Sequence, residues 1–182
     1  MEKLLSLKRI NQVAMAVFVA AVLSGLSTNV VTAESNPPPF KESHLEYYAQ
    51  LDVRLPGIST AFLPPINTTL SANFGAGTLF ASNITEGVAA TSKLLGSVRG
   101  YTVETSYLGS PDSWLLEVAF VEYDDGYYNG TLQLQGLVQQ SLTELAITGG
   151  SGSFRGAKGY LVVTLVVDSL PTRTFRHDLT FL

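Results

Sequence analysis

Residues 131–135 read Thr-Leu-Gln-Leu-Gln, and residues 114–120 read Trp-Leu-Leu-Glu-Val-Ala-Phe. Successive side chains of a β-strand point to opposite sides, so the leucines of the first stretch share one face and the glutamines share the other. In the second stretch the even-numbered residues, all of them apolar, share one face. This alternation predicts β-strands, and no stretch of the sequence keeps a helical period.

Apolar and β-branched segments recur between turn signals along most of the chain. Eight strands are predicted, over Leu45–Leu55, Asn73–Ala81, Lys93–Thr105, Trp114–Tyr123, Thr131–Val138, Leu142–Thr148, Lys158–Val167 and Arg173–Leu182. Asp124-Asp125-Gly126 and Gly149-Gly150-Ser151-Gly152 are typical of tight hairpin turns. Many short strands with Gly-rich turns indicate a sandwich or a closed barrel, and closure is favoured because it leaves no unpaired edge.

One predicted strand is apolar on both faces. Leu161–Val167 reads Leu-Val-Val-Thr-Leu-Val-Val. Since one face of a strand in a small barrel normally meets solvent, this strand predicts a homo-oligomer in which a partner covers the outer face. The alternative is that the chain's own N-terminal segment or a loop covers it. Val163 is expected to point outward.

The N-terminus has the order of a secretory signal peptide. Lys3, Lys8 and Arg9 precede the apolar run Val13–Leu23, and small residues follow up to Val31-Thr32-Ala33. A membrane anchor is the alternative, but the run is shorter than the roughly 18 residues that a spanning helix needs. We therefore expect cleavage after Ala33 and secretion.

Three regions follow from this division. Residues 1–33 are the expected signal peptide, residues 34–43 a flexible N-terminus of the mature chain, and residues 44–182 the barrel domain. The stretch Ser35-Asn36-Pro37-Pro38-Pro39 accounts for the expected flexibility.

The charge and composition of the chain limit the classes of partner that it is expected to bind. The chain has 11 Lys and Arg against 15 Asp and Glu, for a net charge of −4. Removing residues 1–33 takes away three basic residues and one acidic residue, which leaves a net charge of −6. Such a surface does not attract phosphate backbones or anionic lipid, so neither nucleic acid nor membrane is an expected partner. There is no cysteine, and His44 and His177 are the only histidines, so neither a metal site nor a cofactor is expected.

Three acceptor sequons for N-glycosylation are present. They are Asn67-Thr68-Thr69, Asn83-Ile84-Thr85 and Asn129-Gly130-Thr131. Behind a signal peptide they predict at least one glycan, on exposed turns or strand ends.

Three stretches resemble motifs of the plant dirigent family. Ile84-Thr85-Glu86-Gly87, followed by Leu94–Tyr101, resembles a Leu-Thr-Glu-Gly turn and a Val-Gly-x-Ala-Gln-Gly strand. Tyr128–Leu132 is similar to Tyr-Asn-Gly-Ser-Thr-Leu, with one residue missing. Thr148–Tyr160 follows Gly-Gly-Thr-Gly-x-Phe-Arg-x-Ala-Arg-Gly-Tyr closely. The order and spacing of the motifs hold over Leu45–Leu182.

This resemblance implies an all-β fold, an eight-stranded antiparallel barrel of the dirigent and allene-oxide-cyclase type. It also implies a trimer or dimer in the extracellular space of the plant cell wall, the apoplast. Dirigent proteins bind phenoxy radicals, such as those of coniferyl alcohol, and direct their coupling to one lignan stereoisomer. An external oxidase makes the radicals, and the protein needs no cofactor. Some relatives instead cyclise or dehydrate a substrate through a quinone methide.

The polar pocket residues of the family carry over only in part. The resemblance places Leu51, Ser82, Thr102 and Ser153 where family members have Asp, Asp, Tyr and Asp, and Lys158 where they have Arg. Asp52 follows Leu51, but on an ideal strand it points to the opposite face.

The remaining polar candidates for the substrate pocket are Arg99 and Tyr101, and the candidate catalytic residues are Lys158 and His177. Lys158 would donate a hydrogen bond to a phenol or quinone oxygen. Arg99 is equally compatible with a surface charge. His177 shares a strand face with Phe175, Leu179 and Phe181, a pattern also typical of a hydrogen-bonded core histidine.

Three functions fit these observations. The first is stereocontrol of phenoxy radical coupling. The second is cyclisation or dehydration of a phenylpropanoid or terpenoid, with Lys158 or His177 as the catalytic group. The third is non-catalytic binding of an apolar ligand or a glycan in defence. A radical coupling protein needs an added oxidant, whereas a cyclase does not.

Overall fold

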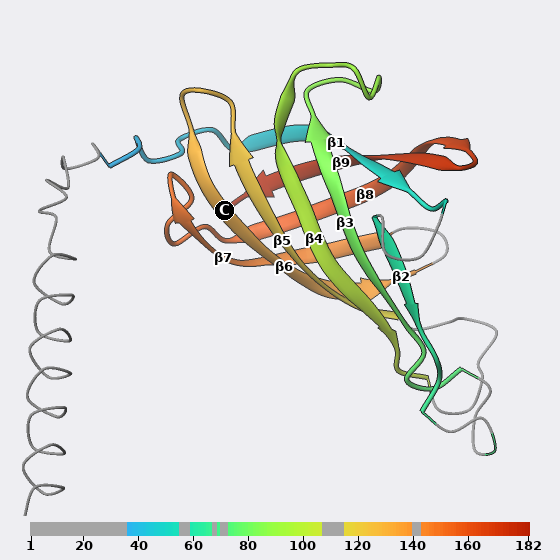
Figure 1. Cartoon of the computed structure of the whole chain (residues 1–182). Helices are drawn as coiled ribbons and strands as arrows, with labels where there is room; N and C mark the ends of the chain where they lie inside the picture. Colours follow the sequence, from blue (N-terminus) through green and yellow to red (C-terminus); the bar gives the residue numbers. More distant parts are fainter. Residues whose placement is uncertain (1–35, 55–58, 67–68, 70–72, 107–114, 140–142) are drawn as a thin grey trace, which may run out of the picture. The chain divides into compact units, whose positions relative to one another are not determined.

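The computed structural model describes residues 36–54, 59–66, 69, 73–106, 115–139 and 143–182. Within these residues the regular structure consists of nine strands (Figure 1). They are β1 (His44–Asp52), β2 (Thr60–Leu63), β3 (Gly77–Thr85), β4 (Leu94–Glu104), β5 (Leu115–Asp124), β6 (Asn129–Val138), β7 (Thr143–Gly152), β8 (Gly159–Ser169) and β9 (Thr172–Phe181). This part of the chain contains no helix that is long and apolar enough to cross a membrane.

Eight of the strands close into an antiparallel barrel, as the sequence predicts. The hydrogen-bonded order runs β1-β9-β8-β7-β6-β5-β4-β3, and β1 then pairs with β3 from Tyr48↔Thr85 to Gln50↔Asn83. The short strand β2, which the sequence analysis missed, pairs with the first half of β3, from Leu63↔Gly77 to Thr60↔Phe80. Strands β1 and β2 thus follow one another along β3 and leave little of its edge unpaired.

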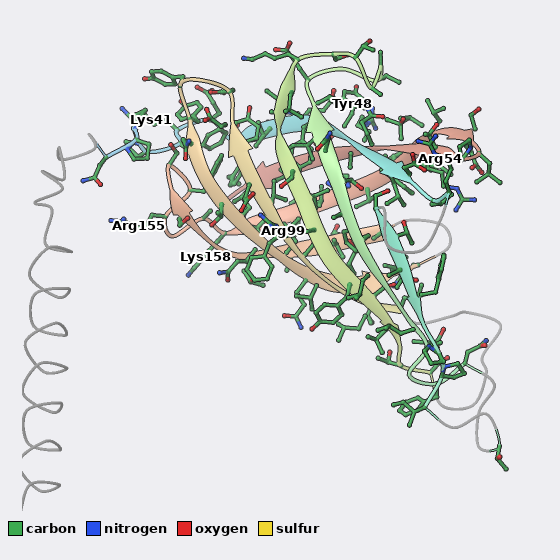
Figure 2. All side chains as sticks on the ribbon, in the orientation of Figure 1. Lys41, Tyr48, Arg54, Arg99, Arg155 and Lys158 are labelled. Atoms are coloured by element: carbon green, nitrogen blue, oxygen red, sulfur yellow. The ribbon has the colours of Figure 1, made fainter. Side chains whose placement is uncertain are left out.

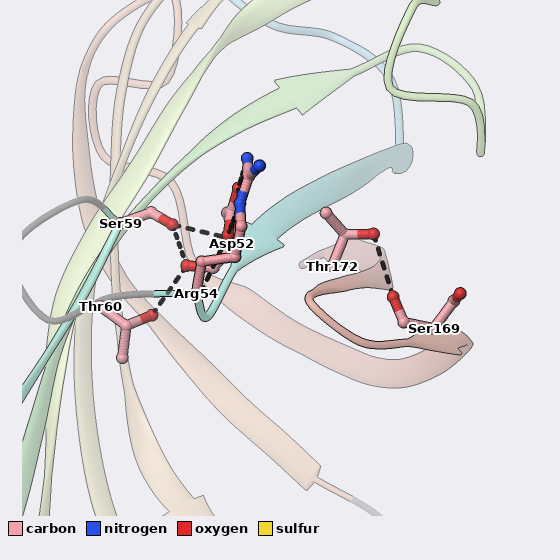
Figure 3. Close-up of polar contacts among 6 residues, drawn as sticks. All are labelled: Asp52, Arg54, Ser59, Thr60, Ser169 and Thr172. Carbon is pink, nitrogen blue, oxygen red and sulfur yellow. Dashed lines mark hydrogen bonds and ion pairs between the residues drawn. The ribbon is translucent and has the colours of Figure 1, made fainter.

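Hydrogen bonds hold the end of β1 to the start of β2 (Figure 3). The backbone N–H of Asp52 donates to Ser59 Oγ at 3.0 Å, and the hydroxyls of Ser59 and Thr60 donate to the Asp52 carbonyl oxygen. The Asp52 carboxylate accepts from Arg54 Nε at 2.8 Å, and these bonds hold the pKa of Asp52 below its usual value. Asp52 therefore makes a structural contact at the barrel rim.

The two predicted turns differ in outcome. The turn at Asp124-Asp125-Gly126 is confirmed: Asp125 Oδ1 accepts the backbone N–H groups of Tyr127 and Tyr128, and Gly126 has a φ of 95°. The run 149–152 is part of β7, and the chain turns after it. A Cβ on Gly152 would lie 2.3 Å from the Asn129 carbonyl oxygen, so the glycine permits close approach to β6.

The apolar interior follows from the pairing of β5 and β6. Ala119 lies opposite Leu134 and Val121 opposite Leu132, and all four are buried. Odd-numbered residues of β5 therefore point inward. The even-numbered apolar face of residues 116–120 points outward, and Phe120 is 47% exposed.

The pairing of β8 with β9 corrects the expectation for Val163. Leu161 and Val163 lie opposite Leu179 and His177, so Val163 points into the barrel rather than outward. The register shifts between Leu165 and Val167, where Leu165 and Val166 remain 44% and 40% exposed. Within the described residues no segment covers this part of β8. Self-association through it stays a prediction, which sedimentation analysis would test.

An aromatic cluster closes one end of the barrel, which we call the closed end. The ring of Phe40 lies 5.0 Å from that of Phe154 and 4.8 Å from those of Tyr128 and Phe181. The Phe40 N–H donates to the Ser153 carbonyl oxygen at 2.8 Å. Phe40, in the described part of the segment 34–43 for which the sequence predicts flexibility, is therefore held on the barrel.

Candidate functional site

The inner wall of β5 carries an acid in an otherwise uncharged row. Glu117 points inward between Leu115 and Ala119, opposite Thr102 on β4 and Gly136 on β6. The neighbouring inward residues Leu115 and Thr102 are only partly buried, unlike the fully buried Val121 and Leu132 nearer the closed end. The carboxyl group thus lies in the half of the barrel away from the closed end, which we call the mouth half.

Burial without a partner perturbs this carboxyl group. Desolvation raises the pKa of Glu117 to about 7. Among the residues that the structure describes, none donates a hydrogen bond to it or forms an ion pair with it. Near neutral pH the group therefore exists in both protonation states, as a general acid and base requires.

Two buried aromatic side chains on the inner wall carry neutral polar atoms. Tyr47 on β1 lies opposite His177 on β9, and Tyr47 Oη and His177 Nδ1 share a hydrogen bond of 3.2 Å. Burial lowers the pKa of His177 to about 4 and raises the pKa of Tyr47. The charge of Glu117 contributes further to the raised pKa of Tyr47, so Glu117 acts electrostatically on one member of this pair. At neutral pH Glu117 is the one of these three residues that changes charge.

Three of the pocket residues expected from the sequence do face the interior. Ser82 is buried opposite Val98 on β4, and Thr102 lies directly across from Glu117. Leu51 lies opposite Arg173 at the end of β1. Of these, only Thr102 is a direct strand neighbour of the ionisable Glu117.

Arg99 and Tyr101 lie outside the barrel. In the register of β4 and β5 they share the outer face with Val103 (Arg99 is labelled in Figure 2). Arg99 forms an ion pair with Glu122. Tyr101 is 40% exposed. Arg99 and Tyr101 share one face of β4, as the sequence predicts, but this face points outward. These two residues therefore line no interior site.

Ser153 and Lys158 lie at the closed end. Ser153 is buried, and its Oγ accepts the Asn129 N–H at 3.0 Å. Lys158 is exposed just before β8. The structure brings His177 to Tyr47, but it brings Lys158 to neither of them.

The remaining polar expectations concern metal binding and glycans. Within the described part of the chain no three His, Asp or Glu side chains come together as a metal site, and His44 contacts Asp178 at 2.6 Å on the surface. Asn83 and Asn129 are exposed, Asn83 within β3 and Asn129 at the start of β6, while Asn67 lies outside the described residues. Glycosylation stays a prediction.

Glu117 is the residue that sequence reasoning missed. The even-numbered face of its strand is the more apolar one, which hides the fact that the odd-numbered face is internal. One signal was available: Leu132 and Leu134 mark the inner face of the next strand. Only the register shows that Glu117 shares that face.

The stability of Glu117→Gln relative to the native chain is expected to rise with pH. The folded pKa of about 7 exceeds the ordinary 4.5, so the stabilising proton is fully bound in the folded chain below pH 4.5 and is lost as pH rises through 7. The amide never ionises. Thermal unfolding should give a difference near zero at pH 4 and about 1–3 kcal/mol in favour of the variant at pH 8, after allowance for partial solvent screening.

His177 is the same in both chains, so its opposite contribution, which is lost as pH falls from 6.5 through about 4, cancels in the comparison. A stability difference that stays constant from pH 4 to 8 would show that Glu117 has an ordinary pKa.

The fold and this site together define a closed antiparallel barrel with one strongly perturbed acid on its inner wall. Residues 43–181 match the family model described as Dirigent-like protein. The chain belongs to the dirigent family, as its motifs indicate.

The most informative relatives are curated dirigent-family proteins and one solved structure. Pterocarpan synthase 1 of Glycyrrhiza echinata is 30% identical over 158 residues, which cover 79% of this chain and 82% of that protein. Dirigent protein 24 of Arabidopsis thaliana is 30% identical over 113 residues, 60% of this chain and 37% of that protein. A solved pterocarpan synthase dirigent protein superposes with a TM-score of 0.64 at 26% identity, over 79% of this chain and 97% of that chain.

Proposed function

We propose that this protein is a dirigent-type barrel that cyclises a phenolic alcohol inside its mouth half with loss of water. Glu117 transfers the protons. The observation that supports this most directly is an interior carboxyl group with a pKa of about 7 and no hydrogen-bond partner among the described residues.

The proposed reaction begins on a phenol that carries a benzylic hydroxyl group. Protonated Glu117 gives its proton to that hydroxyl, the carbon–oxygen bond breaks and water leaves. The phenol oxygen releases its proton to solvent, and its electron pair completes a quinone methide. A second hydroxyl of the same molecule then adds to the benzylic carbon and gives its proton to the Glu117 carboxylate, while the phenol oxygen regains a proton. The net change is the loss of one water, with no oxidant.

The choice of a phenolic substrate rests on the relatives and on the site. The relative from Glycyrrhiza echinata is a pterocarpan synthase by name, and this chain covers 82% of its length. Tyr47 and His177 supply a neutral polar pair on the inner wall, suited to a hydrogen bond with a phenol rather than with an anion. Leu115 and Ala119, which flank Glu117 on the inner face of β5, are apolar and would hold the ring and exclude bulk water.

Stereocontrol of phenoxy radical coupling is the second candidate, and family membership supports it. In that reaction an external oxidase supplies the radicals, for example from coniferyl alcohol, and the barrel only orients them. Radical coupling requires no proton transfer by Glu117, so this function leaves the raised pKa of Glu117 without a role.

Incubation with and without a one-electron oxidant separates the two. A phenolic benzylic alcohol with a second hydroxyl placed to close a ring should be converted without oxidant. Turnover that appears only with coniferyl alcohol and oxidant would favour radical coupling. Binding without turnover in either mixture would favour the third hypothesis, a non-catalytic module for apolar ligands or glycans.

We also propose that the protein is exported to the apoplast and acts as a homo-oligomer. The order of residues 1–33 predicts cleavage after Ala33. N-terminal sequencing of the protein from the medium of plant cells should start at or near Glu34. Secreted material that retains Met1 would contradict cleavage.

A further inference from the structure

Three of the chain's cations gather at the closed end of the barrel, whereas Glu117 lies in the mouth half. Lys41, Arg155 and Lys158 line one pocket of about 370 Å³. Figure 2 shows all three labels at the same end of the barrel. A volume of this size is at the lower end of the range for small-molecule sites, which suits a ligand of one or two rings.

These three cations form no ion pair with any described residue, unlike three of the other arginines. Arg54, Arg99 and Arg173 pair with Asp52, Glu122 and Asp168, respectively. No described acid lies within ion-pair distance of Lys41, Arg155 or Lys158. Two acidic groups line the pocket, the Glu42 side chain and the α-carboxylate of Leu182, against three cations. In a chain of net charge −4, the pocket is thus a local excess of positive charge.

The frame of the pocket is fixed by the backbone. The Phe40 N–H donates to the Ser153 carbonyl oxygen at 2.8 Å, and the Phe181 N–H donates to the Ser43 carbonyl oxygen at 3.0 Å. These bonds join the segment before β1 to the turn after β7 and to the end of β9. Lys41, Arg155 and Lys158 therefore lie on segments that are hydrogen-bonded to the rest of the barrel, and not on independent loops.

The floor of the pocket is aromatic. The rings of Phe40, Phe154 and Phe181 contact one another, with centroids 4.8 to 6.2 Å apart. An apolar floor under guanidinium and ammonium groups suits a ligand with a ring and an acidic group. A carboxylate matches the planar fork of Arg155, which can bind both its oxygens.

We propose that this pocket is a second binding site, distinct from the barrel interior, for a small carboxylate carried on a ring. Two sources have this chemistry: a uronate sugar and an aromatic carboxylic acid. In either case Arg155 and Lys158 bind the carboxylate, Lys41 adds attraction from the facing segment, and the ring lies over the aromatic floor.

The test is calorimetric titration of the full folded chain with digalacturonate and, separately, with ferulate. The uncharged methyl ester of each probe serves as its control. Arg155→Gln combined with Lys158→Gln should weaken binding of the acids at least tenfold and leave the esters unaffected. Lys93→Gln, which removes a cation outside the pocket, should leave affinity unchanged. Affinity should also fall as salt is raised, because exposed charges are screened.

The two probes identify the source. Tighter binding of digalacturonate indicates a uronate site, and tighter binding of ferulate indicates an aromatic acid site. The proposal is overturned if esters bind as tightly as acids, if neither acid binds, or if the double variant binds like the native chain. The Glu117→Gln variant should bind the preferred acid with unchanged affinity. The binding result therefore does not depend on whether the proposed cyclisation occurs.

Discussion

Glu117→Gln is expected to lower the rate of oxidant-free cyclisation by a factor of about 10²–10⁴, the usual contribution of a positioned general acid and base. The amide keeps the size and polarity of the side chain but can neither give up a proton at neutral pH nor take one. The rate should be measured as kcat with a phenolic benzylic alcohol, together with a near-ultraviolet spectrum that shows an intact fold. If the proposed cyclisation occurs, the native protein should show a pH–rate profile with an apparent pKa near 7.

Glu122→Gln is the matched control. Glu122 lies on the same strand but faces outward, where it forms an ion pair with Arg99. Loss of an exposed pair contributes little to stability and should leave the rate unchanged. The role of Glu117 would be refuted by equal activity of Glu117→Gln and the native chain, or by equal losses in the two variants.

The largest effect on stability is expected for Leu134→Ala, at about 2–5 kcal/mol of the free energy of unfolding. Leu134 is 1% exposed and lies opposite Ala119 and Ile147 in the fully buried half of the barrel. Truncation leaves a cavity that neighbouring strands fill poorly, because their positions are fixed by pairing on both sides. Urea unfolding followed by circular dichroism measures the change.

Leu137→Ala makes the same chemical change three residues later on β6. Leu137 points outward and is 38% exposed, so the expected loss is about 0.5 kcal/mol or less. Comparable losses in the two variants would contradict the inward and outward assignment of β6. A large loss for Leu137 alone, dependent on protein concentration, would instead indicate that a partner covers this face.

Much of the fold was predictable because its signals are local. Period-two alternation and the turn at Asp124-Asp125-Gly126 depend on neighbouring residues alone, and both predict elements that the structure contains. The short strand β2 was missed because its four residues carry no period. The sequence predicts a strand at Asn73–Ala81, whereas β3 spans Gly77–Thr85, since the last residues of β3, Ser-Asn-Ile-Thr, look like a turn.

The site was less predictable, and the reason is register. Family motifs drew attention to Lys158 and Ser153, which lie at the closed end, and strand alternation drew attention to Arg99 and Tyr101, which lie outside. His177 was found because its strand is apolar on the face that points inward. Nothing within β5 alone marks Glu117 as internal.

The sequence by itself determined that this protein is an all-β member of the dirigent family. Strand period, turn residues and family motifs are each properties of short stretches of sequence, so they can be recognised without the tertiary structure. Only the tertiary structure decided which side of each strand is inside. Val163 faces His177, and Glu117 faces Thr102, because β8 and β5 are each held in one register by two neighbours in a closed ring. A shift of one residue would turn every side chain of a strand to the other face, so the placement of the acid depends on pairing between distant segments and not on the residues around it.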